Sequence, residues 1–181
     1  MKYLSLFVIG LFLSSCGGFI PNEIQNGKVL GVMPLQYGRV SYQTSNRLPS
    51  EREDIFRQAR RWAAFHVGNP SHALAISDNL IGDIIATGRI DKQYIKTRSG
   101  PQLIPALDYA ASIECYDRYY RVTLTNFRYD LGPQGSYGVE LRPKGMNKNR
   151  VKQQLEIIHE QVNQIINSLQ EFIDAEAKRT Q

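Results

Sequence analysis

Two long segments, residues 104–115 and 119–127, alternate hydrophobic and polar side chains on either side of Asp117-Arg118. Alternation with a period of two is typical of β-strands that bury one face, and two such strands joined by a short turn predict a hairpin. This hairpin restricts the possible folds, because its apolar face must be covered by other elements of the chain.

A two-residue turn at Asp117-Arg118 would fix the pairing and sort the side chains into two faces. The buried face would hold Ala111, Ile113, Cys115, Tyr120, Val122 and Leu124. The other face would hold Asp108, Ala110, Ser112, Glu114, Arg121, Thr123, Thr125 and Phe127. Glu114 and Arg121 would then be directly opposed, a pair worth about 0.2–1 kcal/mol. This pairing gives Glu114 a structural role and weakens its candidacy as a catalyst.

The segments around the hairpin complete an α+β pattern. Strands are predicted at residues 39–43, 72–77 and 82–90, and helices at 50–66 and 151–177. The first helix opens with a capping box, Ser50 and Glu53, and the second carries a long amphipathic stripe. The order is a strand, a helix, four strands and a helix. One antiparallel sheet can cover both helices if they lie on the same side, which leaves the other face of the sheet open.

The C-terminal helix permits two interpretations of oligomeric state. Its length and its charges, basic at the start and acidic near the end, are compatible with an antiparallel homodimer through an overhanging part. Alternatively Ile157, Ile166 and Ile173 widen its apolar stripe and the whole helix packs intramolecularly, as expected for a monomer. We favour the monomer.

The N-terminus indicates export. Lys2 precedes a short hydrophobic run that ends well below the length of about 20 residues that a spanning helix needs. Leu13-Ser14-Ser15-Cys16 resembles a bacterial lipobox, in which the cysteine receives a diacylglyceryl group and becomes the mature N-terminus. The alternative is ordinary signal-peptide cleavage after Gly17. We expect lipidation at Cys16.

The resemblance to lipoproteins also predicts where the protein resides. An aspartate after the lipidated cysteine is the usual inner-membrane retention signal, and Gly17 stands there instead. We therefore expect an outer-membrane lipoprotein that faces the periplasm.

Lipidation would leave Cys115 as the single thiol, so no intramolecular disulfide is predicted. The net charge of +5 falls to +4 without Lys2, and the basic residues are scattered.

We divide the chain into a signal peptide at residues 1–15, a lipidated N-terminus and Gly/Pro-rich tether at 16–37, and a core at 38–130. Apolar residues at positions 29, 30, 32 and 33 are unusual for a pure spacer, so part of the tether is expected to pack on the body. Residues 131–181 supply a connection and the C-terminal helix of the same domain. Residues 91–103 are expected to be a basic loop with Lys92, Lys96 and Arg98.

Three motifs give a resemblance to a known family. "IFRQARRW" (55–62), "IIATGRI" (84–90) and "IECYDRYYRVTLTNF" (113–127) are similar to a family of uncharacterised bacterial lipoproteins, domain of unknown function 4468. The resemblance implies a TATA-binding-protein-like fold over residues 38–130 and brings no assigned reaction or cofactor. The family usually has Asp-Gly at the hairpin turn where this chain has Asp117-Arg118. With arginine in place of glycine, the turn would either be strained or have a different length. A different length would shift the register of the hairpin.

The sequence contains no recognised catalytic or metal-binding motif, and the three histidines lie far apart. No cofactor or metal is predicted. A nucleic-acid partner is not expected either, because the modest positive charge forms no basic stripe. The arginines at 52, 57, 60 and 61 are interpreted as a solvated helix face, with anion binding as the alternative.

Two functional hypotheses remain. The first is a non-catalytic binding or assembly module that engages an envelope protein, glycan or lipid through the open sheet face. The alternative is a hydrolase of envelope material with an unrecognised site. The residues predicted for the binding face are Glu114, Arg121, Thr123, Thr125 and Phe127, assisted by Lys92, Lys96 and Arg98.

Overall fold

The computed structural model of the chain describes residues 18–66, 74–97 and 100–179. Seven elements form its centre: β5 (Arg39–Arg47), α1 (Arg52–His66), β6 (Leu74–Asp78), β7 (Asp83–Ile90), β10 (Ala106–Tyr116), β11 (Tyr119–Asp130) and α2 (Lys148–Arg179). Their order is the predicted strand, helix, four strands and helix. The strands are antiparallel and lie side by side as β5-β11-β10-β7-β6.

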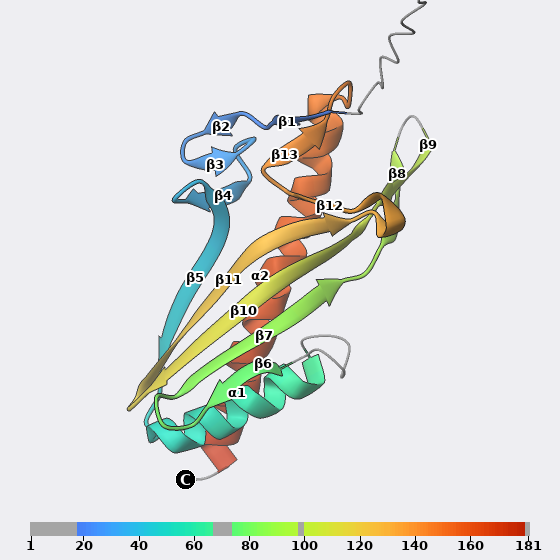
Figure 1. Ribbon diagram of the computed structural model, residues 1–181. Helices are drawn as coiled ribbons and strands as arrows, with labels where there is room; N and C mark the ends of the chain where they lie inside the picture. The colour runs from blue at the N-terminus through green and yellow to red at the C-terminus, as the bar shows by residue number, and fades with distance from the viewer. Residues whose placement is uncertain (1–17, 67–73, 98–99, 180–181) are drawn as a thin grey trace, which may run out of the picture.

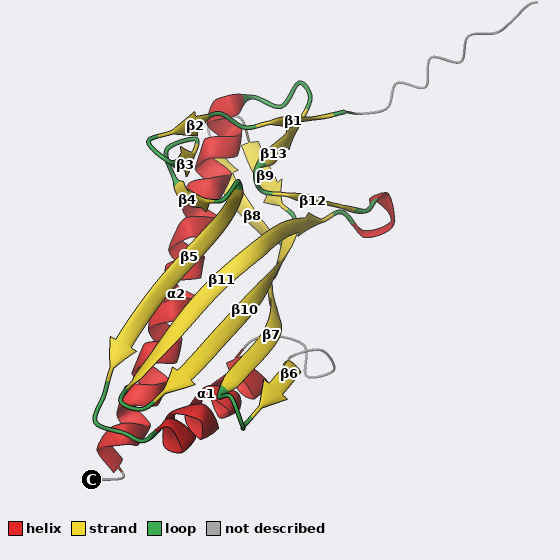
Figure 2. Ribbon diagram, turned by 60° about the vertical axis from the view of Figure 1, so that its left-hand side comes forward, coloured by secondary structure: helices red, strands yellow, loops and turns green. Residues whose placement is uncertain are grey.

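Both helices pack on the same face of this sheet, and the other face is open (Figures 1 and 2). The predicted α+β class is therefore confirmed. The two helices also contact each other, since the indole Nε1 of Trp62 donates a hydrogen bond to Ser168 Oγ at 3.1 Å. We refer to the surface opposite the helices as the open face.

Shorter strands extend this core. They are β1 (Phe19–Pro21), β2 (Ile24–Gln25), β3 (Lys28–Val29), β4 (Met33–Gln36), β8 (Gln93–Thr97), β9 (Gly100–Ile104), β12 (Ser136–Gly138) and β13 (Leu141–Pro143), with a 3-10 turn at Gly132–Gln134. β2, β3 and β4 continue the sheet beyond β5, and β12 pairs with the end of β11, which gives nine strands. The pairs β1–β13 and β8–β9 form two small sheets of their own.

Residues 18–37 do not form the predicted tether. They build β1 to β4, and Val29, Leu30, Val32 and Met33 are buried in the main core. These apolar side chains explain the difference, because packing them removes hydrophobic surface from water, at about 25 cal/mol per Å². The domain therefore begins at residue 18 or before it, much closer to Cys16 than the composition indicated.

The predicted loop at residues 91–103 is also different, because it contains the hairpin of β8 and β9. This hairpin leans onto α2: the side-chain amides of Gln93 and Gln161 exchange hydrogen bonds at 3.0 and 3.3 Å, and Gln154 Nε2 donates to Leu103 O at 3.4 Å. Ile104 at its end is 1% exposed. The apolar and amide side chains tie the segment to the helix.

The turn of the long hairpin has the predicted two residues, and Tyr116 pairs with Tyr119. Arg118 adopts a left-handed conformation with φ of 65°, whereas Asp117 is not among the residues with positive φ. Backbone hydrogen bonds hold the turn in place: Leu48 N donates to Arg118 O, and Arg118 N donates to Ser50 O, both at 3.0 Å. The strain therefore falls on one residue, and the register is unchanged.

The same turn caps the first helix. Asp117 Oδ1 accepts a hydrogen bond from the backbone N–H of Arg52, the first residue of α1, at 3.0 Å. A carboxylate at this position satisfies a free amide and complements the positive end of the helix dipole. Thus a residue 65 positions away performs the capping that the Ser50–Glu53 pattern predicted from local sequence.

The apolar stripe of α2 is covered within the chain. Leu155, Ile158, Val162 and Leu169 are fully buried against the sheet and α1, and Ile173 is 1% exposed. At its start, Asn147 Oδ1 accepts a hydrogen bond from Asn149 N at 2.8 Å, a local cap. The predicted stripe is thus used intramolecularly, and the oligomeric state remains a prediction.

Candidate functional site: the open face of the sheet

The open face has a centre of short side chains. Two rows of opposed residues cross the strands from β5 to β7: Ser41, Thr125, Ala110 and Thr87 in one, and Gln43, Thr123, Ser112 and Ile85 in the next. We call these two rows the central floor. The next row toward the hairpin turn contains Ser45, Arg121, Glu114 and Asp83, and the next row the other way contains Arg128, Asp108 and Arg89. Rows with both signs of charge therefore border a nearly uncharged floor.

Glu114 and Arg121 form the predicted cross-strand pair. They are opposed in the register, and Arg121 Nη1 lies 3.2 Å from Glu114 Oε2. The same carboxylate oxygen accepts a hydrogen bond from the Tyr116 hydroxyl at 2.9 Å, and this bond raises the pKa of Tyr116 above its usual value. The rings of Tyr116 and Tyr119 stack with centroids 4.5 Å apart. Glu114 is thus held by two neighbours on its own face.

Thr123 and Thr125 lie on the open face as predicted, and both are half-buried. Thr125 Oγ1 donates a hydrogen bond to Val40 O on β5 at 3.2 Å, which fixes its rotamer. Their short side chains keep this part of the surface close to the backbone of the sheet. A partner that lies on the central floor could therefore approach the strands closely.

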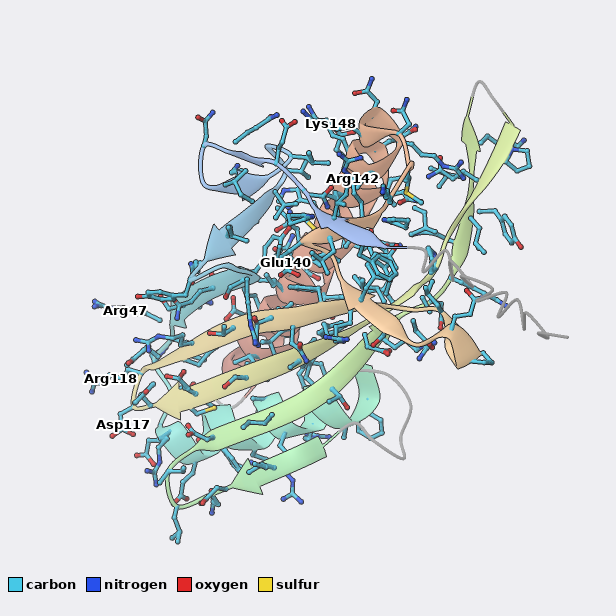
Figure 3. All side chains as sticks on the ribbon, turned by 45° about the horizontal axis from the view of Figure 1, so that its top comes forward. Arg47, Asp117, Arg118, Glu140, Arg142 and Lys148 are labelled. Carbon is cyan, nitrogen blue, oxygen red and sulfur yellow. The ribbon has the colours of Figure 1, made fainter. Side chains whose placement is uncertain are left out.

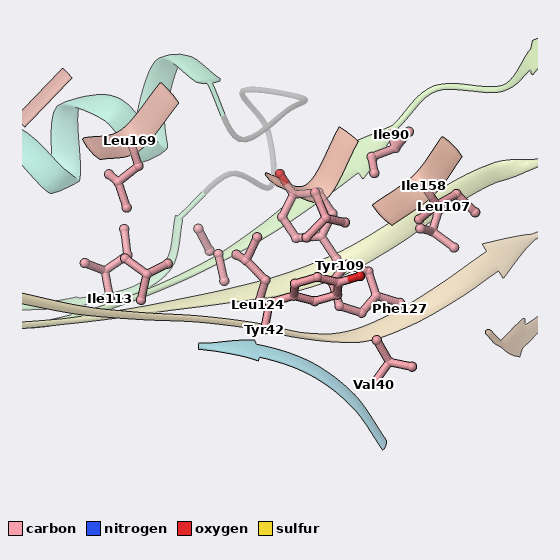
Figure 4. Packing of buried hydrophobic residues seen from close by; sticks show 14 of the residues in the cluster. Val40, Tyr42, Ile90, Leu107, Tyr109, Ile113, Leu124, Phe127, Ile158 and Leu169 are labelled. Atoms are coloured by element: carbon pink, nitrogen blue, oxygen red, sulfur yellow. The ribbon is translucent and has the colours of Figure 1, made fainter. Parts of the chain in front are cut away.

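The prediction for Phe127 is wrong. This side chain is 1% exposed and belongs to the core on the helix side of the sheet (Figure 4). Its ring lies 5.8 Å from that of Tyr42, edge to face, and 6.0 Å from that of Tyr109. Phe127 therefore contributes to stability and is removed from the candidate binding face.

A β-bulge at Asn126 is the physical reason. Asp108 pairs with Arg128 and Ala110 pairs with Thr125, so Tyr109 alone stands opposite two residues of β11. Asn126 is the extra residue, with φ of 57°, a conformation that Asn tolerates better than most residues. One added residue reverses the alternation beyond it. Phe127 and Tyr129 then point to the helices.

The bulge also creates a hollow that the sequence did not indicate. A depression of about 290 Å³ is lined by Arg39, Asn126, Arg128 and Glu140 together with Gly38, Phe127, Gly138 and Leu141. Glu140 Oε1 accepts a hydrogen bond from Val40 N at 2.7 Å. The Arg128 guanidinium donates to the carbonyl and the hydroxyl of Ser136 at 3.0–3.1 Å.

Arg89 is the second arginine, after Arg128, in the row that borders the central floor on the side away from the hairpin turn. Arg89 Nη1 lies 3.1 Å from Asp108 Oδ1, and its other terminal nitrogen contacts Asp130. The hydrogen bond from Arg89, followed by that from the backbone N–H of Gly132, lowers the pKa of Asp130. These exposed pairs each contribute little to stability. They keep both signs of charge fixed at the edge of the central floor.

The basic residues of the predicted loop do not join this face. Lys92 and Lys96 are exposed, but the β8–β9 hairpin that follows Lys92 and carries Lys96 is bound to α2 on the helix side. Arg98 lies outside the described residues. The structure therefore brings together Glu114, Arg121, Thr123 and Thr125, and separates Lys92 and Lys96 from them.

Comparison with known proteins identifies the fold family. The sequence profile described as "Domain of unknown function (DUF4468) with TBP-like fold" matches residues 42–130. This segment of the chain is a DUF4468 domain. A crystal structure of a DUF4468 family protein from Bacteroides ovatus aligns with a TM-score of 0.65 and 13% identity, covering 84% of this chain and 96% of that one. No curated protein sequence is significantly similar to the chain.

A second solved structure is similar in fold. A TBP-like protein from Parabacteroides distasonis aligns with a TM-score of 0.54 and 14% identity, covering 77% of this chain and 98% of that one. Identities this low establish the fold alone. The DUF4468 domain here therefore has a TBP-like architecture.

His159 and Cys115, residue types that often act in catalysis, lie on the helix side of the sheet. Within residues 18–66, 74–97 and 100–179, no group of three or more His, Cys, Asp or Glu side chains could hold a metal ion. His159 lies on the helix side, where its Nδ1 is 2.7 Å from the Tyr42 hydroxyl and its Nε2 is 3.2 Å from Asn163 Nδ2. Cys115 is fully buried, and burial raises the pKa of its thiol to about 12.

The outer side of α1 carries a second depression, of about 550 Å³. Arg57, Arg60 and Arg61 line it together with Phe56 and Phe65. Arg57 is paired with Asp54, one turn earlier in the helix. The depression therefore combines arginines with apolar walls, and both interpretations of the arginine set, solvated and anion-binding, stay open.

Cys16, the predicted lipidation site, lies outside the described residues. Among the helices in the described part of the chain, none has the length and hydrophobicity that a membrane crossing requires.

Proposed function

We propose that this protein is a lipid-anchored envelope lipoprotein that binds another envelope protein through the open face of its DUF4468 domain and catalyses no reaction itself. The anchor is an acylated Cys16, and the location is the periplasmic side of the outer membrane. The lipobox Leu13-Ser14-Ser15-Cys16 and the following Gly17 support these two points.

The central floor is the observation that carries the binding proposal. Half-buried Thr123 and Thr125 lie between rows of fixed ion pairs, and neither helix covers them (Figure 1). A shallow surface with dispersed polar groups favours recognition over catalysis, which requires convergent groups in a pocket. Mixed charges at both borders favour a protein partner with both signs of charge over a uniformly charged polymer.

A carboxylate that borders this floor, Glu114, supports the non-catalytic interpretation. Glu114 is held by Arg121 and by the Tyr116 hydroxyl through the same oxygen. These two contacts hold the carboxylate against its own face of the sheet. A hydrolase that used Glu114 as its base would need to release it from both neighbours.

Mass spectrometry of the mature protein from its host tests the anchor. We expect an N-terminal Cys16 that is heavier by the mass of its acyl groups, and a Cys16→Ser variant that is released from membranes with an unchanged melting temperature. An unmodified N-terminus at Gly18 would show that ordinary signal-peptide cleavage occurs instead.

The open face is tested by adding bulk and charge to the central floor. Thr123→Lys, Thr125→Lys and the double variant are compared with Gln164→Lys, which adds the same charge at an exposed position of α2 on the helix side. Whole-envelope crosslinking with each bait should recover a partner with the parent and with Gln164→Lys, and lose it with the double variant. Folded floor variants that still capture every partner would refute this binding surface.

A further inference from the structure

The first described residues are fixed to the body of the domain. Lys144 N donates a hydrogen bond to Gly18 O at 2.8 Å, and β1 pairs with β13 immediately afterwards. Asn22 follows with a 5% exposed side chain, whose Nδ2 donates to Val139 O at 3.1 Å and to Leu141 O at 3.2 Å. From residue 18 onward the chain is therefore attached to one end of the molecule.

This attachment leaves little distance between the anchor and the domain. Cys16 lies two residues before Gly18, and two residues span at most about 7 Å. If Cys16 carries lipid, the end of the domain that holds Gly18 lies within a few ångströms of the lipid headgroups. The orientation of the domain is then set by whatever surface this end presents.

That surface is basic. Lys144, Lys148, Arg150 and Lys152 follow one another through the connection into α2 and its first turns, and three of them are exposed. Glu23 contacts this group, because its carboxylate pairs with Lys148. Figure 3 shows Lys148 and Arg142 at the end opposite to Asp117 and Arg118 at the hairpin turn. We call Lys144, Lys148, Arg150 and Lys152 the basic end.

Helix stability does not explain these positions. The N-terminus of a helix is its positive pole, so acidic side chains stabilise it and basic ones oppose it. The first turn of α1 follows this rule with Glu53 and Asp54, whereas the first turn of α2 contains no acidic residue. Lysine and arginine therefore stand where the helix itself gains least from them.

An aromatic side chain lies beside the anchor. Phe19 is 43% exposed, although one side of its ring packs on Tyr137 with centroids 4.4 Å apart. A partly exposed aromatic ring next to basic residues is typical of surfaces that contact the headgroup region of a bilayer. Phe19 and the basic end thus point to the same ligand.

We infer that the basic end, with Phe19, is a membrane-facing surface that binds anionic phospholipid headgroups and orients the domain, an inference that rests on the lipid anchor proposed above. Each basic residue near an anionic surface contributes about 1 kcal/mol. α2 would then begin at the membrane and run away from it. Its C-terminal end, α1 and the hairpin turn at Asp117-Arg118 would lie at the end of the domain away from the bilayer (Figure 1). The open face would be accessible from the side.

Chemical coupling tests this orientation whether or not the host lipidates Cys16. The mature chain is coupled through Cys16 to a maleimide phospholipid in vesicles, since the buried Cys115, with its raised pKa, reacts slowly. Acetylation of lysines is then followed by mass spectrometry. On vesicles with phosphatidylglycerol we expect Lys144 and Lys152 to react several-fold more slowly than on pure phosphatidylcholine, and exposed Lys96 to react equally on both.

Vesicle sedimentation of the unanchored Cys16→Ser protein supplies the matched comparison. Replacing Lys144, Arg150 and Lys152 by Gln should weaken binding to anionic vesicles roughly a hundredfold at low salt, from three contributions of about 1 kcal/mol. The control replaces exposed Arg47, Arg60 and Arg118 by Gln, the same change in charge away from the basic end. Equal losses in both variants, or equal acetylation on both vesicle types, would overturn the inference. An unmodified Cys16 in the host would refute only the anchor.

Discussion

The long hairpin of β10 and β11 behaves differently on the two sides of Asn126. Between the turn and the bulge, every pair predicted from the sequence is present, including Glu114 with Arg121. Beyond the bulge, Phe127, which was expected on the open face, points into the core. Both halves have the same alternating composition, so composition alone does not determine which face a strand residue occupies.

The difference shows how a single added residue determines which side chains of a strand are buried. Below the bulge, β11 presents polar side chains to the open face; above it, the same strand buries Phe127 and Tyr129 and presents Arg128. The upper half also requires a neighbouring glycine: a Cβ on Gly88 would lie 2.1 Å from the ring of Tyr109. This close approach explains the glycine in the family-like segment "IIATGRI".

The largest expected effect concerns Phe127. Phe127→Ala should destabilise the protein by about 3–5 kcal/mol, because it leaves a cavity between Tyr42, Tyr109 and α2. Thr123→Ala, on the open face of the lower half, should cost less than about 1 kcal/mol. Urea denaturation of both variants measures the contrast. A Phe127→Ala variant as stable as Thr123→Ala would mean that the bulge is absent in solution.

A smaller effect is expected at the bulge itself. Asn126→Val should cost about 1–2 kcal/mol, because a β-branched side chain is strained at φ of 57°. Asn126→Gly is the matched control and should be nearly neutral, since glycine adopts this conformation freely. If both substitutions have the same melting temperature, Asn126 does not have the left-handed conformation.

These two halves also define what sequence patterns could predict. The order of elements, the helix-covered face and the lower hairpin follow from periodicity, which reports burial over many residues. The bulge does not, because a single left-handed asparagine leaves no periodic signal. Phe127 in "LTNF" continues the apparent alternation only if Asn126 is counted as a regular strand residue.

The prediction of a tether in the N-terminal segment failed for a different reason. Its glycines and prolines resemble a spacer. Val29, Leu30, Val32 and Met33, which indicated that part of the segment packs on the body, are four buried side chains within five positions. The buried apolar residues were the informative signal there, and the turn residues only connect the short strands.

The hollow beside Arg39, Arg128 and Glu140 combines three distant segments, so no local pattern could indicate it.

The turn of the lower half offers a stabilising substitution. Arg118→Gly should raise stability by about 0.5–1 kcal/mol, because relief of left-handed strain exceeds the added freedom of the unfolded chain. Asp117→Gly is the control and should destabilise, since it removes the hydrogen bond to Arg52 N that caps α1. Thermal denaturation monitors both. A loss of stability in Arg118→Gly would show that the arginine side chain, and not its backbone conformation, determines the energy of the turn.

The smallest effect concerns the Glu114–Arg121 pair. Its coupling free energy can be compared with that of an ion pair above the bulge. A double-mutant cycle with Glu114→Gln and Arg121→Gln should give a coupling of about 0.2–1 kcal/mol, toward the lower end because the arginine side chain is 40% exposed. The equivalent cycle for Arg89 and Asp108, side chains that are 43% and 48% exposed, should give less. Raising the salt concentration to 1 M should weaken both couplings by screening. If the Glu114–Arg121 coupling is zero at low salt, the carboxylate is available to a partner, and the case for Glu114 as a direct binding or catalytic group becomes stronger.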